Sequence, residues 1–149
     1  MIMLIRTTAA NHLFQTLVSE LDAELKIRDG DEHLFYAPLN QAADLPYAVV
    51  AYDEGVATGC GAIRPYGTSV MEIKRMYIRQ AHRGKGIASH LLRELELWAA
   101  SLNCHTCILE TGKNQPEAIR LYHKNHYHVI PNYGPYAHTA NSICFQKEI

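Results

Sequence analysis

Hydrophobic and polar positions recur with two different periods along this chain. Between residues 11 and 25 apolar side chains return every three or four positions, which predicts one amphipathic helix or a pair of helices ending near Gly30. A second stripe with the same spacing predicts a helix from about Gly86 to Ser101. Pro116 suits the first position of a third, shorter helix, "PEAIRLYHKN". The helical segments are thus spread along the chain rather than clustered.

Short apolar runs bounded by turn residues predict strands between these helices. The predicted strands are residues 4–8, 47–52, 56–64, 70–78, 105–111, 127–130 and 142–149. The three strands from 47 to 78 follow each other through tight turns, which indicates a meander. The order of elements predicts a single mixed α/β domain over residues 1–149, with six to seven strands and about four helices.

Composition narrows the classes of function. The 149 residues carry a formal net charge of −1, which argues against nucleic acid as the main partner. No apolar run is long enough to span a membrane, and the N-terminus lacks the pattern of a signal peptide, so we expect a cytoplasmic protein. Cys104 and Cys107 form a single CxxC pair, and His123 and His126 lie three apart. Neither pattern is sufficient to predict a metal site.

A glycine-rich turn stands just before the second helix. Arg83-Gly84-Lys85-Gly86 combines two cations with two flexible positions, where the first N–H groups of a helix lack partners. Such a turn can hold a phosphate, or it can be only a tight turn. The sequence has no Walker P-loop, and Ser89 replaces the third glycine of a dinucleotide fingerprint.

The same segment resembles the signature [QR]-x-x-G-x-[GA] of the GNAT superfamily of acetyl-CoA-dependent N-acetyltransferases. The matching residues are Arg83, Gly84, Lys85, Gly86, Ile87 and Ala88. The resemblance extends to "EIKRMYIRQAHRGKGIASHLL" and "ILETGKNQPEAIRLYHKN", and the order of elements agrees over nearly the whole chain. It implies the GNAT fold, a mostly antiparallel mixed sheet flanked by helices.

The resemblance also implies a donor site for acetyl-CoA, without a metal. Backbone N–H groups from Arg83 through Ala88 would hold the pyrophosphate of CoA. In this fold the fourth and fifth strands diverge, so that Met76, Tyr77 and Ile78 would bind the pantetheine arm. Gln115 stands where many relatives carry asparagine near the cofactor. Relatives often end the following helix with glycine, so here Asn125 or His126 must take the left-handed conformation.

Attack of an amine on a thioester needs a base and an acid. Glu72 has the spacing of a catalytic glutamate in the histone-acetyltransferase branch, and its apolar neighbours would suit a base; the alternative is that it pairs with a cation. Glu110 on the next strand is a second carboxylate for this role. Tyr122 matches the tyrosine that protonates the leaving sulfur in many members; otherwise it is a core aromatic.

The acceptor is less well defined by the resemblance than the donor. The candidate acceptor residues are Phe35, Tyr36, Asn40, Arg64, Arg75, Tyr133 and Tyr136. Arginines among aromatic residues would bind a carboxylate, so we expect a small-molecule amine such as an amino acid. The alternatives are a protein N-acetyltransferase and a non-catalytic acyl-CoA sensor of the same fold. The resemblance leaves a homodimer open.

Overall fold

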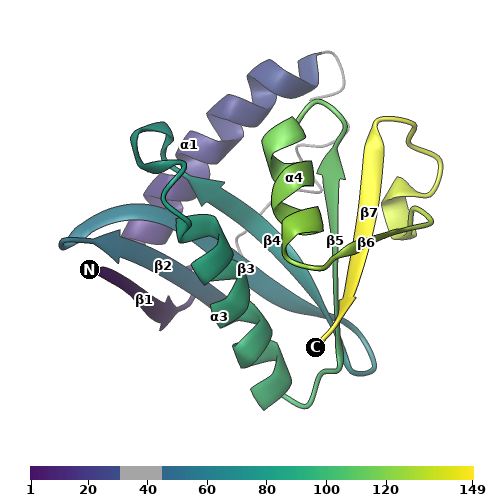
Figure 1. Cartoon of the computed structure of the whole chain (residues 1–149), viewed down its shortest axis with the longest axis horizontal. Coiled ribbons are helices and arrows are strands. Elements are labelled where there is room, and N and C mark those ends of the chain that lie inside the picture. Colours follow the sequence, from purple (N-terminus) through teal and green to yellow (C-terminus); the bar gives the residue numbers. More distant parts are fainter. Residues whose placement is uncertain (31–44) are drawn as a thin grey trace.

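The computed structural model describes residues 1–30 and 45–149, which form one seven-stranded sheet (Figure 1). The strands lie in the order β1-β2-β3-β4-β5-β7-β6. Their bounds are β1 Ile2–Thr7, β2 Tyr47–Asp53, β3 Val56–Gly67, β4 Val70–Ile78, β5 Thr106–Gly112, β6 His128–Ile130 and β7 Ser142–Glu148. Neighbouring strands run antiparallel except β4 and β5, which run parallel. The predicted meander and the mostly antiparallel mixed sheet are confirmed.

The described helices cover opposite faces of this sheet. They are α1 (His12–Asp29), α3 (Ile87–Ser101) and α4 (Pro116–Lys124), with short 3₁₀ turns at Gln80–His82 and Gly134–Tyr136. Alternate residues of β2 divide between two cores: Val49 packs with α3 and α4, whereas Val50 packs with α1. Figure 1 shows α3 and α4 in front of the sheet and α1 behind it. The region between β4 and β5 is therefore bordered by α4 on one face of the sheet and by α1 on the other.

Local chemistry explains where these helices begin and end. The Asn11 side chain accepts a hydrogen bond from the Phe14 N–H at the start of α1, and Gly30 ends that helix with φ +56°. After α4, His126 takes the left-handed conformation with φ +71°.

The structure describes three α-helices where about four were expected; the early helical region is one 18-residue helix. The candidates Phe35, Tyr36 and Asn40 lie outside the described residues.

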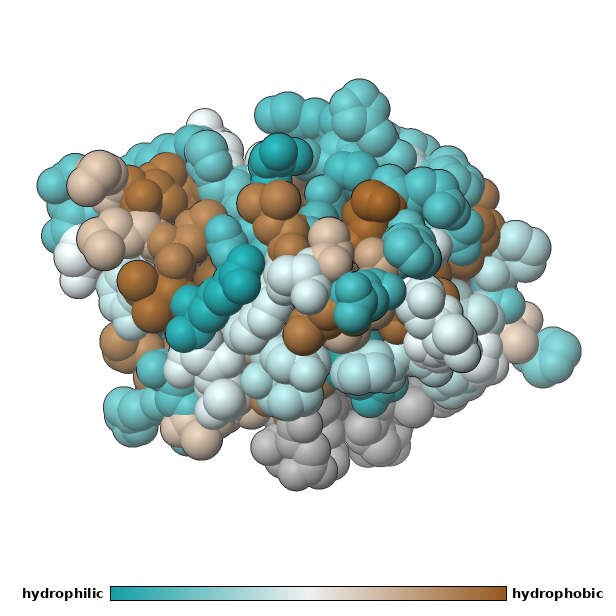
Figure 2. Space-filling view, turned by 90° about the horizontal axis from the view of Figure 1, so that it is seen from below, coloured by the Kyte–Doolittle hydropathy of each residue, from teal (hydrophilic) through white to brown (hydrophobic). Residues whose placement is uncertain are grey.

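Some of the large apolar side chains that are exposed at the surface belong to the edge strand β1. Met3 and Ile5 are among the exposed ones. Figure 2 shows apolar surface on the side of the molecule where Figure 1 places β1. A homodimer stays a prediction.

Candidate active site

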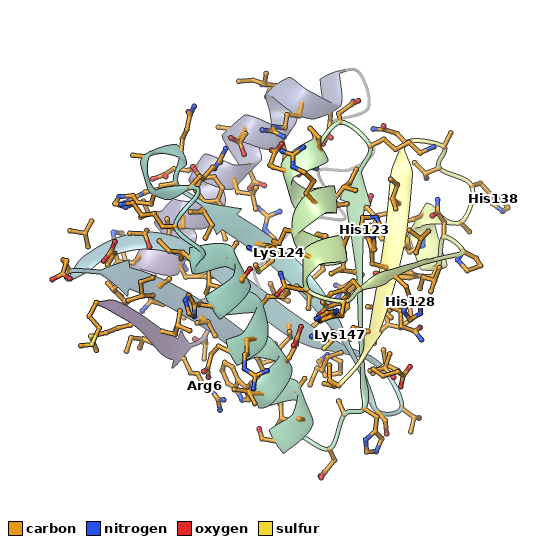
Figure 3. All side chains as sticks on the ribbon, in the orientation of Figure 1. Arg6, His123, Lys124, His128, His138 and Lys147 are labelled. Carbon is orange, nitrogen blue, oxygen red and sulfur yellow. The ribbon has the colours of Figure 1, made fainter. Side chains whose placement is uncertain are left out.

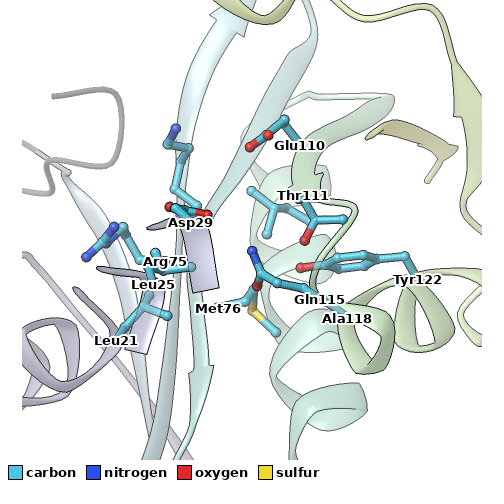
Figure 4. Close-up of a pocket in the computed structure, with 13 residues that line it drawn as sticks. Leu21, Leu25, Asp29, Arg75, Met76, Glu110, Thr111, Gln115, Ala118 and Tyr122 are labelled. Atoms are coloured by element: carbon cyan, nitrogen blue, oxygen red, sulfur yellow. The ribbon is translucent and has the colours of Figure 1, made fainter. Parts of the chain in front are cut away.

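The divergence of β4 and β5 opens a small cavity in the sheet. The parallel ladder has three residue pairs, from Val70–Thr106 to Glu72–Ile108, and ends there. Beyond it a cavity of about 90 Å³ lies between the strands, with α1 on one side and α4 on the other (Figure 4). The charged side chains in its lining are Asp29, Lys74, Arg75 and Glu110. The implied divergence of the two strands is confirmed, and polar groups face the gap.

A β-bulge in β4 shapes the wall of this cavity. Arg75 and Met76 together face the single residue Gly61 of β3, and Arg75 has φ +60°. The Cys60 thiol donates to the Arg75 carbonyl at 3.4 Å. A Cβ on Gly61 would lie 2.6 Å from the sulfur of Met76 and 2.9 Å from Leu95 Cδ1, so a larger residue here would require both side chains to shift. Sequence analysis missed the bulge; the glycines of "TGCGA" were the available signal.

The glycine-rich turn borders a larger cavity of about 510 Å³. Gly84 and Gly86 have φ +82° and +81°, a conformation that favours glycine. The Gly86 carbonyl accepts from the His90 N–H at 3.2 Å, so the N–H groups of residues 87–89 have no carbonyl of the helix behind them. The Arg83 N–H already donates to Gln80 at 3.2 Å. The donors available to an anion therefore begin at Gly84.

Both cations of this turn face carboxylates. The Arg83 guanidinium donates from Nη2 to Glu24 at 2.9 Å and from Nε to the Ile78 carbonyl at 2.8 Å. Lys85 Nζ lies 3.9 Å from an oxygen of Asp53. The side chains of Arg83 and Lys85 thus have acidic partners, which sequence analysis did not foresee.

One face of α1 ties together the elements around the larger cavity. Glu20, Glu24 and Arg28 are spaced one helical turn apart and pair with Arg79, Arg83 and Glu117 respectively. These partners lie just after β4, in the glycine-rich turn and in the first turn of α4. The positions of the turn and of α4 are therefore linked through α1.

Tyr122 stands where the two cavities meet. The residues that line both are Leu21, Met76, Gln115, Ala118 and Tyr122. The Tyr122 side chain is buried. Burial is the main cause of its raised pKa, and the negative charge of Glu110 raises the pKa further, so the phenol keeps its proton at neutral pH. Figure 4 shows Tyr122 and Gln115 pointing into the smaller cavity. The predicted donor residues that line the larger cavity are Met76, Tyr77, Ile78, Arg83, Gly84, Gly86, Ile87, Ala88 and Gln115, whereas Lys85 does not line it.

Glu110 has the proton affinity of a base that works near neutral pH. Burial raises the pKa of its carboxyl from 4.5 to about 7, while a hydrogen bond from the Ser142 hydroxyl, 2.7 Å away, opposes the rise. Figure 4 shows its side chain reaching toward the cavity that Tyr122 also lines. A proton donor and a proton acceptor therefore share one small cavity.

Glu72 is held in a different way. Its side chain is 1% exposed; one carboxylate oxygen accepts from Arg64 Nε at 2.9 Å and the other from the Tyr133 hydroxyl at 2.6 Å. Glu72 lines neither cavity. The pairing with a cation, anticipated as its alternative role, is present, and the cation is Arg64.

The predicted acceptor residues separate into two groups. Arg64, Tyr133 and Tyr136 surround Glu72 and Lys74 on one face of the sheet, where Lys74 Nζ donates to the Tyr136 hydroxyl at 3.4 Å. Arg75 instead turns its guanidinium toward α1, where it pairs with Asp22 and lies 3.4 Å from the Val18 carbonyl (Figure 4). The structure therefore brings three of these four residues together.

The cysteines and histidines form no metal site in the part of the chain that the structure describes. All four cysteines are free and buried. Figure 3 shows His123, His128 and His138 well apart, on α4, β6 and the loop before β7. Among residues 1–30 and 45–149, no helix has the length and apolarity needed to cross a membrane.

Comparison with known proteins identifies the family. The model of the acetyltransferase (GNAT) family matches residues 11–127. An IAA acetyltransferase from Azospirillum brasilense is 32% identical over 96% of this chain and 97% of its own length. A Klebsiella pneumoniae protein assigned as an acyl-CoA N-acyltransferase superposes with a TM-score of 0.85 at 31% identity, covering 99% of this chain and 97% of its own.

A more distant structure shares the fold. The PaiA N-acetyltransferase from Thermoplasma acidophilum, in complex with coenzyme A, superposes with a TM-score of 0.75 at 14% identity, over 100% of this chain and 99% of its own. Together with the split sheet and the glycine-rich turn, these matches establish that the chain belongs to the acetyltransferase (GNAT) family and is an acyltransferase.

Proposed function

We propose that this protein transfers the acetyl group of acetyl-CoA to the primary amine of a small molecule, an amino acid or a related amine. The observation that carries the proposal is the position of Tyr122, which lines both cavities. On one side lies a large cavity bordered by the first N–H groups of α3, which have no helix carbonyl to donate to, and on the other a small one with Glu110. This arrangement suits a donor in the larger cavity and an acceptor in the smaller one, with their reacting groups meeting at Tyr122.

The chemistry of the larger cavity suits CoA. N–H groups from Gly84 onward suit the pyrophosphate, and no acidic residue lies in the first turn of α3. Among the residues that the structure describes, β4 has no strand partner on its β5 side after Glu72, which suits the amides of a pantetheine arm. The Ile78 carbonyl is engaged by Arg83, so we assign the arm mainly to Met76 and Tyr77.

Glu110 and Tyr122 supply the two proton transfers. Glu110 accepts the proton that the acceptor amine loses, and Tyr122 donates its phenolic proton to the departing sulfur. Of the two carboxylates, Glu110 is the better placed base because it lines the cavity, whereas Glu72 has both oxygens engaged. We assign Glu72 the positioning of Arg64 and Tyr133 beside the acceptor.

The size of the smaller cavity supports a small acceptor. Its volume is about 90 Å³, against about 510 Å³ for the larger cavity. A head group of a few atoms fits there, while the rest of the acceptor extends toward the face that carries Arg64 and Tyr133. The Arg64 side chain is 44% exposed, so its guanidinium can bind the carboxylate of an amino acid.

Release of free thiol from acetyl-CoA, measured with and without amines, tests the proposal. We expect Tyr122→Phe to slow amine-dependent release about 100-fold with unchanged acetyl-CoA affinity, because a general acid contributes about that much. Tyr47→Phe is the control, since Tyr47 packs on Trp98 and lines neither cavity. Acetyl-CoA binding without release for any amine would identify a sensor, and release with peptides alone would identify a protein acetyltransferase.

The pH profile tests the base separately. With a weakly basic amine that stays neutral throughout, we expect the rate to rise with pH and level off above about 7, as Glu110 loses its proton. Glu110→Gln should remove this rise. A profile that is unchanged in Glu110→Gln would exclude Glu110 as the base.

A further inference from the structure

The charges that line the larger cavity are balanced, with two exceptions. Glu24 pairs with Arg83, and Glu117 pairs with Arg28 at the rim. Arg120 and Lys124 also line this cavity, and neither has an acidic partner among residues 1–30 and 45–149. The uncompensated positive charge of the cavity therefore comes from α4, not from the glycine-rich turn.

Arg120 and Lys124 lie on one face of α4, because residues four apart on a helix are neighbours. The next residue, Asn125, donates its side-chain N–H to the Ser89 hydroxyl at 3.1 Å. Ser89 belongs to the first turn of α3, whose N–H groups have no helix carbonyl to donate to. Figure 3 shows Lys124 at the end of α4 that lies toward α3. The two cations therefore line the same cavity as the glycine-rich turn, on a helix that is hydrogen-bonded to the start of α3.

The two parts of the cavity suit two kinds of phosphate. The backbone N–H groups of the turn form a curved set of neutral donors, which matches a diphosphate bridge. The cations on α4 stand one helical turn apart and suit a compact phosphomonoester, which carries close to two negative charges at neutral pH. Coenzyme A has both groups: a diphosphate and a single phosphate on the ribose.

We propose that Arg120 and Lys124 bind the ribose phosphomonoester of coenzyme A and so select it over nucleotides that lack this phosphate. The inference rests on acetyl-CoA as the donor. It assigns to α4 the recognition of the nucleotide end, whereas the turn and β4 hold the diphosphate and the arm. The site then distinguishes coenzyme A from its precursor without the phosphate by charge.

Calorimetric titration with coenzyme A and with 3′-dephospho-coenzyme A tests this assignment. The wild-type protein should bind coenzyme A about tenfold more tightly, the discrimination expected from one or two charge-assisted hydrogen bonds near solvent. Arg120→Gln and Lys124→Gln should each lose most of this preference, with dephospho-coenzyme A affinity unchanged within about twofold. Lys113→Gln is the control, because Lys113 is exposed and lines neither cavity.

Each other result has a distinct meaning. Equal wild-type affinity for the two ligands overturns the inference and leaves the proposed donor intact. Equal weakening of both ligands in Lys124→Gln overturns it too, because the lysine would then contact the diphosphate. Absence of binding by either ligand overturns the proposed function itself. Thermal unfolding of the ligand-free variants should match the wild type, since both positions are exposed.

Discussion

Glu110 should make the folded protein less stable at neutral pH than at acid pH. Its pKa rises from 4.5 to about 7 on folding because the carboxyl is buried. A carboxyl with a higher pKa in the folded chain binds its proton more tightly there. The stabilisation that the protonated Glu110 carboxyl gives the folded state is therefore complete below about pH 4.5 and is lost as the pH rises through about 7. At about 1.4 kcal/mol per pH unit the loss reaches about 3 kcal/mol. Partial exposure to the cavity lowers the expectation to about 2 kcal/mol.

Urea unfolding of the wild type and of Glu110→Gln across a pH series measures this loss. Glutamine keeps the shape and an oxygen that accepts from Ser142, but it carries no charge. We expect Glu110→Gln to gain about 2 kcal/mol over the wild type between about pH 5 and pH 8.5. Glu148→Gln, at an exposed position, should show no such trend. A stability difference for Glu110→Gln that is independent of pH would refute the reasoning, and one of opposite sign would show that the charged form is stabilised by folding.

Three further substitutions test the geometry of the site. Gly61→Ala would push a methyl group to 2.6 Å from Met76, so we expect a loss of about 1–3 kcal/mol in urea unfolding and weaker acetyl-CoA binding. Gly86→Ala places a side chain at φ +81° and should cost about 1 kcal/mol in the same assay, although it meets no atom within 4 Å. Glu72→Gln should raise the KM for the acceptor and leave acetyl-CoA affinity unchanged, because the charge that orients the acceptor side is lost. A fall in kcat as large as that of Glu110→Gln would instead identify Glu72 as the base.

Sequence patterns predicted the elements well where periodicity was strong. The strand over residues 70–78 has the predicted bounds, and the helix after the glycine-rich turn begins at Ile87 and ends at Ser101. Tyr122 and Glu110 were predicted as candidate acid and second carboxylate, and both line the same cavity. Local periodicity is sufficient to predict the elements, because period and capping act within one segment, whereas the roles of Tyr122 and Glu110 were expected from the family resemblance.

Features that depend on distant partners were not predictable in this way. Arg83 was expected to add counter-charge at the turn, yet its guanidinium is bound by Glu24, 59 positions earlier in the chain. Arg75, a candidate acceptor residue, lines the smaller cavity, but its guanidinium pairs with Asp22 on α1, a partner that spacing did not indicate. Spacing along the chain carries no information about which carboxylate faces a given cation, since the pairing is set by how helices pack on the sheet.

The short ladder between β4 and β5 also has a consequence for local unfolding. Three residue pairs join the strands β1–β4 to the strands β5–β7, while the ladders on either side of this junction are longer. Cooperative units of a protein tend to separate where few backbone hydrogen bonds connect them. We therefore expect amide hydrogen exchange to divide the sheet into two units at this junction. The gap that we propose admits the thioester would then also be the boundary along which the protein opens.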